Sequence, residues 1–359
     1  MQAMAPSPWL PEFDPTDTVA GRSFVEHLTT DAAALQRELL TEILRRNAHT
    51  EYLCSFLLLP DGGFPSDGNL REAFKKLVPV SGYDDIKPYV DRITSGRELS
   101  TNLLCSESIT HLIRSSGTSG GMQKIFPSTA EELDRKLFFY GVQELVRNMH
   151  LHAHQEGKRG MGLRLTLTFP AEHTRPACTS RRAPLPTTAA ANSGTRSTLS
   201  GRITHAPLGN AVIHRYLREP DPVLADEVAS ECAAKPWDGI VARPWPRARC
   251  ALTILTGLMA QYIPILRSYC GGRLPIISPC YASTECATGV NLRPLEPPGR
   301  APYALLPNIA YFEFAEIQPR DEETPTIDDN GDPGEMKLVD LVDVEIGRSY
   351  ELVVTTFVG

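Results

Sequence analysis

Three neighbouring segments constrain most strongly what this chain can fold into. Residues 107–113 (ESITHLI) have the β-branched character of a strand, residues 114–124 (RSSGTSGGMQK) combine three glycines with four hydroxyls, and residues 130–154 repeat apolar side chains at helical spacing. Ser128 or Thr129 is a suitable cap for that helix. A strand therefore leads into a polar loop, and a long helix begins only after it.

Further helices and strands are expected on both sides of these segments. Apolar side chains at helical spacing predict helices within residues 22–48 and 222–235 and a helix that ends at Gly96. The final quarter has the β-rich composition of mixed strands, at residues 310–317 and 350–357. The sequence therefore predicts an α/β fold in which mixed β-sheets are flanked by helices.

The glycine- and hydroxyl-rich loop allows three interpretations: a phosphate cradle, a nucleophilic serine on a sharp turn, or a flexible loop. The string GTSGG matches the G-x-S-x-G nucleophile elbow, with Ser119 as the nucleophile. That elbow needs a helix directly after the serine, whereas Pro127 intervenes here. The candidate histidines, His205 and His214, also lie in or beside a segment of disordered character. A serine hydrolase using Ser119 is therefore only the third alternative.

A phosphate cradle agrees better with the loop. A Walker-type P-loop is excluded, because no glycine directly precedes Lys124. Glycines nevertheless allow the backbone to approach a polyphosphate closely, successive N–H groups form an anion-binding concavity, and Lys124 adds positive charge. Taken alone, the loop leaves a ligand site and a flexible turn equally open.

A second motif favours the ligand site. Residues 279–285 (PCYASTE) place an aromatic ring, two hydroxyls and a carboxylate in one short stretch after a strand-like segment. A nucleotide needs a flat surface for its base, donors for its α-phosphate and a carboxylate to hold Mg²⁺. Tyr281, Ser283 or Thr284, and Glu285 have the chemistry for these three tasks in turn.

Composition excludes several other classes of protein. The net charge of −7 and the pI near 5.8 argue against a nucleic-acid partner. No secretory signal is visible. The longest apolar run, residues 251–266, is too short to span a bilayer. This run is better interpreted as a buried helix or a strand–turn–helix. Eight cysteines without a C-x-x-C pair indicate reduced, structural thiols. We expect a cytoplasmic protein with no membrane partner.

Two other clusters are poor metal sites. The three histidines at 150, 152 and 154 have no cysteine partner nearby in the sequence, and they lie near the end of the predicted helix, a position that histidines favour. Residues 327–335 (IDDNGDPGE) superficially match a calcium loop, but Pro333 and the leucine at the twelfth position break the pattern. A surface turn is the better interpretation.

The two nucleotide-type motifs, in their order, resemble the plant auxin-responsive acyl acid–amido synthetases, a branch of the adenylate-forming, firefly luciferase-like superfamily. The resemblance is carried by residues 115–124, 281–285 and 351–359, with supporting matches that include EELDRKLFFY at 131–140. It implies an adenylate-forming large N-terminal domain that converts a carboxylic acid and ATP to an acyl-adenylate and pyrophosphate, after which an amino acid displaces AMP. Group-level features favour indole-3-acetic acid over jasmonate as the acid.

The resemblance also implies roles for individual residues. Glu285 would hold Mg²⁺ and, with Thr284, would act in catalysis by stabilising charge on phosphorus. The ATP-binding set would comprise Ser115, Ser116, Gly117, Thr118, Ser119, Gly120, Lys124, Tyr281, Ala282 and Ser283. The partners would be an auxin-like carboxylic acid and an amino acid.

Two departures from the family pattern are expected to matter. The pattern continues beyond ELVVTTFVG into a mobile C-terminal cap domain, which is absent from this sequence. Residues 169–204 contain one acidic residue and few large aliphatics, so we expect disorder there. Residues 1–359 would thus form one incomplete adenylating domain, interrupted at 169–204 by a gene or reading-frame error or by a lesion. A catalytically dead, nucleotide-binding relic is the alternative to an active ligase.

Overall fold

The structure is a computed structural model that describes residues 8–59, 62–96, 101–115, 122–151, 222–246, 248, 250–317 and 337–359. The chain divides into two units. Unit 1 comprises Met1–Leu145, Tyr281–Val290 and Ala304–Gly359, and unit 2 comprises Val146–Cys280 and Asn291–Tyr303. The predicted disordered segment 169–204, His152, His154 and residues 327–335 lie outside the described ranges.

Helices dominate the first part of unit 1. They are α1 (Thr18–Thr30), α2 (Ala32–Arg46), α3 (Glu51–Leu57), α4 (Asp67–Leu77) and α5 (Tyr83–Ser95). The helical prediction for 22–48 is correct in type but misses a break at Asp31, which has φ −107° and ψ 40°. Just before the break, the Thr30 hydroxyl donates to the Glu26 carbonyl oxygen at 2.7 Å, a side-chain bond that competes with the helical backbone ladder.

The end of α5 agrees with its prediction. Gly96 caps the helix with φ 62°, in the left-handed region where glycine carries no Cβ penalty. At its other end the carboxylate of Asp85 accepts a hydrogen bond from the Gly82 N–H at 2.7 Å. The helix therefore starts at a fixed residue, Tyr83.

The loop at 115–124 joins two strands, β1 (His111–Arg114) and β2 (Ile125–Ser128), which pair antiparallel with Arg114 opposite Ile125. The sequence predicted the first strand and missed the second, because Pro127 argues against a strand. A two-stranded sheet consists only of edges, and an edge strand tolerates proline. Helix α6 (Ala130–Leu151) follows directly, and Thr129 caps it by accepting a hydrogen bond from the Glu132 N–H at 3.2 Å.

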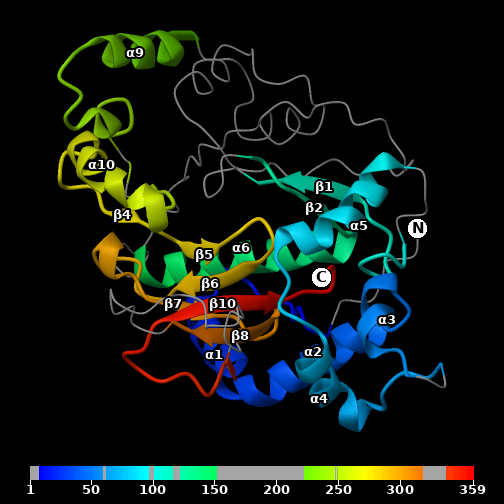
Figure 1. Cartoon of the computed structure of the whole chain (residues 1–359). Coiled ribbons are helices and arrows are strands. Elements are labelled where there is room, and N and C mark those ends of the chain that lie inside the picture. Colours follow the sequence, from blue (N-terminus) through cyan, green and yellow to red (C-terminus); the bar gives the residue numbers. More distant parts are fainter. Residues whose placement is uncertain are drawn as a thin grey trace, which may run out of the picture. The chain divides into compact units, whose positions relative to one another are not determined.

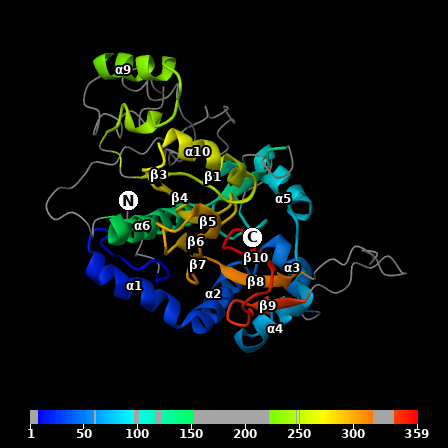
Figure 2. The ribbon, with the colours of Figure 1, turned by 90° about the vertical axis from the view of Figure 1, so that its left-hand side faces the viewer.

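The main antiparallel sheet of unit 1 has the order β10–β8–β9, from β8 (Tyr311–Glu316), β9 (Leu338–Asp340) and β10 (Tyr350–Thr355). Figure 1 shows β10 (red) directly beside β8 (orange), and Figure 2 shows all three strands together. The predicted strands within 310–317 and 350–357 are confirmed.

Helix α2 packs on this sheet through a buried glutamine. The Gln36 amide donates to the carbonyl oxygens of Pro307 and Ala310 at 2.8 and 2.7 Å, and its oxygen accepts from the Phe312 N–H at 2.7 Å. Around it lies a core of buried aliphatic and aromatic side chains from α2, α3, α4, β8 and the chain end: Leu39, Leu40, Ile43, Leu44, Leu53, Leu57, Leu70, Phe74, Tyr311 and Phe357.

Unit 2 contains shorter elements. In the described part these include α9 (Pro222–Ala233), η1 (Ile240–Ala242), β3 (Ala251–Leu252), η2 (Gly257–Tyr262), α10 (Ile263–Tyr269), β4 (Ile276–Ile277) and η3 (Pro298–Arg300). β3 and β4 pair in parallel, and the intervening η2 and α10 supply the crossover that a parallel pair requires. The strand–turn–helix interpretation of 251–266 is thus correct, and the predicted α9 is confirmed.

A further sheet has the order β5–β6–β7, from β5 (Cys280–Ala282), β6 (Ala287–Asn291) and β7 (Tyr303–Leu305). The described part of the chain combines parallel and antiparallel strand pairs with flanking helices, so the fold is the mixed α/β class expected from the sequence. The cysteines of the described ranges, namely Cys54, Cys105, Cys232, Cys250, Cys270, Cys280 and Cys286, are free thiols.

Candidate functional site

The predicted phosphate loop is closed at its base. The Ser115 N–H donates to the Lys124 carbonyl oxygen at 2.8 Å, and the Lys124 N–H donates to the Ser115 Oγ at 2.9 Å. These bonds extend the β1–β2 ladder by one residue pair and bring Ser115 and Lys124 together. The residues between them that were predicted to bind ATP lie outside the described ranges: Ser116, Gly117, Thr118, Ser119 and Gly120.

The second motif forms the tight turn between β5 and β6. The Ser283 N–H donates to the Cys286 carbonyl oxygen at 2.9 Å, and the Cys286 N–H donates to the Ser283 Oγ at 3.3 Å. Thr284 and Glu285 are therefore the two central residues of the turn, and the Glu285 side chain is exposed at its tip. A carboxylate in this position is accessible to a ligand that carries a cation.

Tyr281 and Ala282 lie on β5, immediately before the turn. The Tyr281 side chain is 43% exposed, so much of it is open to solvent. Its carbonyl oxygen accepts a hydrogen bond from the Thr288 hydroxyl of β6 at 2.6 Å, which fixes the backbone that carries the ring. An anchored, partly exposed aromatic ring is a suitable surface for a flat base.

Helix α6 supports the turn from a distant part of the chain. The Lys136 ammonium donates to the Thr284 carbonyl oxygen at 3.4 Å. Burial lowers the pKa of Lys136, and the negative charges of Glu132 and Glu285 oppose that shift. Because α6 follows β2 directly, the same helix connects the base of the phosphate loop with the turn that carries Glu285.

The environment beneath the turn is buried and polar. Burial raises the pKa of Glu132 to about 7, against the opposing charges of Lys136 and Arg135. Burial likewise raises the pKa of the Cys286 thiol, so this cysteine is structural, as the sequence predicted. Sequence reasoning did not assign Glu132 or Lys136 to the site, although their i,i+4 spacing on the predicted helix was a usable signal.

The donor set is suitable for Mg²⁺ but makes no cage for a metal. Within the ranges that the structure describes, no group of three or more His, Cys, Asp or Glu side chains is placed to hold a metal ion. Mg²⁺ commonly takes one or two carboxylates and fills its remaining positions with water and substrate phosphates. The single exposed carboxylate of Glu285 fits that use.

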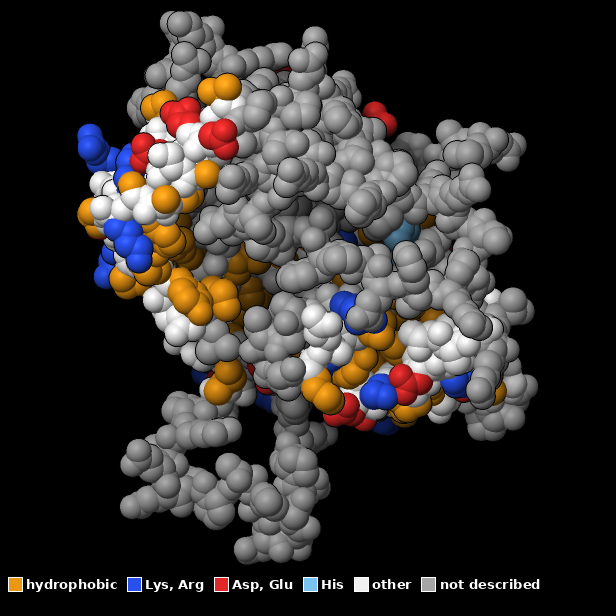
Figure 3. Space-filling view, turned by 90° about the horizontal axis from the view of Figure 1, so that it is seen from above, with side chains coloured by type: hydrophobic (Ala, Val, Ile, Leu, Met, Phe, Trp, Pro, Cys, Tyr) orange, Lys and Arg blue, Asp and Glu red, His pale blue; other side chains and the backbone are white. Residues whose placement is uncertain are grey.

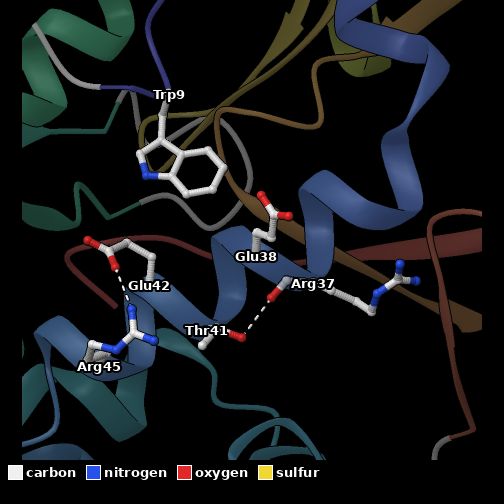
Figure 4. A pocket seen from close by; sticks show the side chains of 6 residues that line it. All are labelled: Trp9, Arg37, Glu38, Thr41, Glu42 and Arg45. Carbon is white, nitrogen blue, oxygen red and sulfur yellow. Dashed lines mark hydrogen bonds and ion pairs between the residues drawn. The ribbon is translucent and has the colours of Figure 1, made fainter. Parts of the chain in front are cut away.

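Two surface hollows are lined by residues of neither motif. One, of about 310 Å³ in unit 1, is lined by Trp9 and by residues of α2, whose polar groups bind one another: Arg45 with Glu42 at 3.1 Å, and the Thr41 hydroxyl with the Arg37 carbonyl oxygen at 2.9 Å (Figure 4). The other, of about 410 Å³ in unit 2, is lined mainly by apolar side chains of the β3–α10 segment, including Met259 and Tyr262. Hydrophobic side chains gather in that region at the left of Figure 3.

The helices that the structure describes are all too short or too polar to cross a membrane. The expected cytoplasmic location stays a prediction. So does the interpretation of the chain as one incomplete domain interrupted at 169–204.

The mixed α/β fold is that of solved acyl acid-amido synthetases. The structure superposes on AtGH3.15 acyl acid amido synthetase in complex with 2,4-DB with a TM-score of 0.68 and 32% identity, over 98% of this chain and 67% of that one. Residues 21–180 and 195–276 match the GH3 family N-terminal domain, and residues 303–359 match the GH3 family central domain. The chain belongs to the GH3 family.

Individual relatives agree with this assignment. The chain is 48% identical to the probable indole-3-acetic acid-amido synthetase GH3.7 of Oryza sativa subsp. japonica, over 98% of this chain and 68% of that protein. It is 36% identical to indole-3-acetic acid-amido synthetase GH3.17 of Arabidopsis thaliana, again over 98% and 68%. The alignment with the rice protein extends over 427 residues, more than the 359 of this chain, so that relative contains internal segments that this chain lacks.

Proposed function

We propose that this chain activates a plant hormone carboxylic acid, indole-3-acetic acid, with ATP and conjugates it to an amino acid. The observation that carries the proposal is the turn Ser283–Cys286, which presents Glu285 at its tip and is braced by Lys136 of the helix that follows the phosphate loop. Relatives named as indole-3-acetic acid-amido synthetases support the choice of acid.

The reaction has two steps. A carboxylate oxygen of the acid attacks the α-phosphorus of ATP, the bond to the pyrophosphate oxygen breaks, and an acyl-adenylate forms. The amine of an amino acid then attacks the acyl carbonyl carbon, loses a proton and displaces AMP. Both steps develop charge on oxygen, so prearranged donors and cations are the groups that accelerate them.

The predicted site residues divide these tasks. The loop between Ser115 and Lys124 would surround the phosphates, with Ser116, Gly117, Thr118, Ser119 and Gly120 as the proposed lining. Tyr281 and Ala282 would lie against the adenine, and Ser283 and Thr284 near the α-phosphate. Glu285 would hold Mg²⁺, which neutralises phosphate charge when bound.

Helix α6 offers a place for the acid. Lys136 supplies a cation, and Leu137 and Tyr140 on the same helix are 48% and 39% exposed. Tyr140 lies one helical turn from Lys136, and an aromatic carboxylate needs both an ionic partner and an apolar surface. This arrangement agrees with indole-3-acetic acid as the acid.

The test is pyrophosphate release from ATP, Mg²⁺ and indole-3-acetic acid, followed by mass spectrometry for the amide after amino acids are added. Glu285→Gln should lower acid-dependent pyrophosphate release by about a hundredfold or more. Glu351→Gln, an exposed carboxylate on β10, is the matched control and should behave like the unsubstituted chain. Equal rates for the two variants would contradict the role of Glu285.

A nucleotide-binding relic is the second candidate, favoured by the internal segments that the rice relative has and this chain lacks. The same assay separates the two. ATP binding without pyrophosphate release or amide product would favour the relic, whereas amide product would exclude it.

A further inference from the structure

Tyr83, the first residue of α5, makes three contacts with the last residue of the phosphate loop and with the strand that follows it. The Ile125 N–H donates to the Tyr83 hydroxyl oxygen at 3.0 Å. The Tyr83 ring lies 5.4 Å from the Phe126 ring, between centroids. The Lys124 ammonium lies 5.2 Å from the centroid of the Tyr83 ring.

The hydrogen bond to Ile125 completes an edge of the two-stranded sheet. In an antiparallel ladder, N–H groups of successive residues point alternately toward and away from the partner strand. Lys124 bonds with Ser115 across the ladder, so the N–H of Ile125 points away from β1. An edge N–H in a partly buried position needs an acceptor, and the Tyr83 hydroxyl provides it.

The same tyrosine also defines the position of a cation. The backbone of Lys124 is held on one side by Ser115 and on the other by the bond from Ile125 to Tyr83. Its half-buried side chain then places the ammonium over the face of the Tyr83 ring, where the ring quadrupole attracts a cation. The positions of both the backbone and the side chain of Lys124 therefore depend on Tyr83.

We propose that Tyr83 is a positioning residue for Lys124, which it holds in place to contact the phosphates of ATP. The proposal rests on the proposed ATP-dependent function and adds to it a residue outside both nucleotide motifs. In this proposal the phosphates are contacted by Lys124 and not by Tyr83. Its effect on ATP binding should therefore pass through Lys124.

A double-mutant cycle tests this dependence. The dissociation constant of ATP in the presence of Mg²⁺ is measured by calorimetry for the full chain, Tyr83→Leu, Lys124→Met and the double variant. Loss of a charge-assisted phosphate contact should weaken binding about tenfold or more in Lys124→Met, and loss of the hydroxyl and ring about fivefold in Tyr83→Leu. If Tyr83 acts through Lys124, the double variant binds no more weakly than Lys124→Met.

Multiplying effects, about fiftyfold in the double variant, would overturn the proposal, because a purely structural tyrosine acts independently of Lys124. If Tyr83→Leu does not fold, Tyr83→Phe, which keeps the ring, can replace it in the cycle. It should also accelerate hydrogen exchange of the Ile125 amide, and unchanged exchange would count against the geometry.

Tyr89→Phe is the matched control, since Tyr89 lies on the same helix and packs its ring against Tyr52 at 5.7 Å. It should leave ATP binding unchanged. Failure of the unsubstituted chain to bind ATP would overturn the proposed function and this inference together. Normal ATP binding with multiplying effects would overturn this inference alone.

Discussion

The guanidinium carbon of Arg135 lies 3.9 Å from the centroid of the Phe357 ring, and the Arg135 residue is only 1% exposed. Arg46 lies 4.8 Å from the same ring, and the Glu131 carboxylate accepts hydrogen bonds from both arginines at 2.7 Å. The Asn47 amide donates to the Phe357 carbonyl oxygen at 3.1 Å. These contacts attach the segment after β10 to α2 and α6, and α6 also carries Lys136 to the turn at Thr284.

Replacing Arg135 should destabilise unit 1 severely. Arg135→Met keeps much of the side-chain volume but removes the charge that pairs with Glu131 in a buried site. Breaking such a pair costs about 3 to 5 kcal/mol, and we expect the lower end because Arg46 still faces Glu131. Urea denaturation measures the loss. Arg45→Met removes two exposed ion pairs, with Glu42 and Asp67, and should change the free energy of unfolding by less than about 1 kcal/mol. A loss no larger than that of the control would contradict the prediction.

Glu132 should make stability depend on pH. Burial raises the pKa of Glu132 from 4.5 to about 7. Between pH 4.5 and about 7, Glu132 is therefore protonated in the folded chain and ionised in the unfolded chain. Stability should therefore fall as pH rises from 4.5 to about 7 and should stay level above 7. Glu132→Gln should remove that fall and be more stable than the parent at pH 8 by on the order of 3 kcal/mol, a value that already includes the attraction of Glu132 to Lys136 and Arg135. Urea denaturation at pH 5 and pH 8 gives both values, with Glu351→Gln as the exposed control. A parallel profile in Glu132→Gln and its parent would rule out this role.

Replacing two helical glycines with alanine should change the stability of the protein in opposite directions. A Cβ atom at Gly21 of α1 would lie 2.2 Å from the Cδ1 of Leu145, which is fully buried. Gly21→Ala should therefore destabilise the protein by about 1 to 3 kcal/mol despite alanine's better helix propensity. Gly68 of α4 has open space around the added methyl, so Gly68→Ala should stabilise by up to about 1 kcal/mol. Thermal denaturation of both variants checks the signs, and Leu145→Val should partly rescue Gly21→Ala.

The buried cysteines should resist modification until the protein unfolds. Cys286 is 1% exposed and burial raises the pKa of its thiol, and burial raises the pKa of Cys105 to about 12. A thiolate-dependent reagent should therefore label neither residue in native buffer. Cys54, which is half-buried, is the internal reference and should react before Cys105 and Cys286. Peptide mapping after labelling with and without urea identifies the sites. Native labelling of Cys286 at the rate of Cys54 would contradict the packing beneath the turn.

The elements that the sequence predicted well are those with a strong local signal. The apolar period and the glycine at position 96 define α5 and its end, and aromatic and β-branched residues indicate β8 and β10. The break at Asp31 and the strand β2 were missed. The first depends on threonine hydroxyls that bind the preceding turn, and the second on an edge position that tolerates Pro127.

The candidate site likewise has parts that the sequence predicted and parts that it did not. Residues 115–124 and 281–285 could be recognised because each motif is contiguous and its residue types express its chemistry. The support beneath them could not, because Lys136 and Thr284 are 148 residues apart in the chain, and a contact at that separation leaves no local pattern.

By itself, the sequence determined the α/β class, the family and the two nucleotide-type motifs, since all three depend on residue type and short-range order. Only the tertiary structure decided that Glu285 stands at the tip of a tight turn, that Lys136 braces this turn and that Tyr83 holds Lys124. The physical reason is that side-chain positions depend on packing between elements distant in the chain, and burial sets the charge state of groups such as Glu132 only once that packing exists.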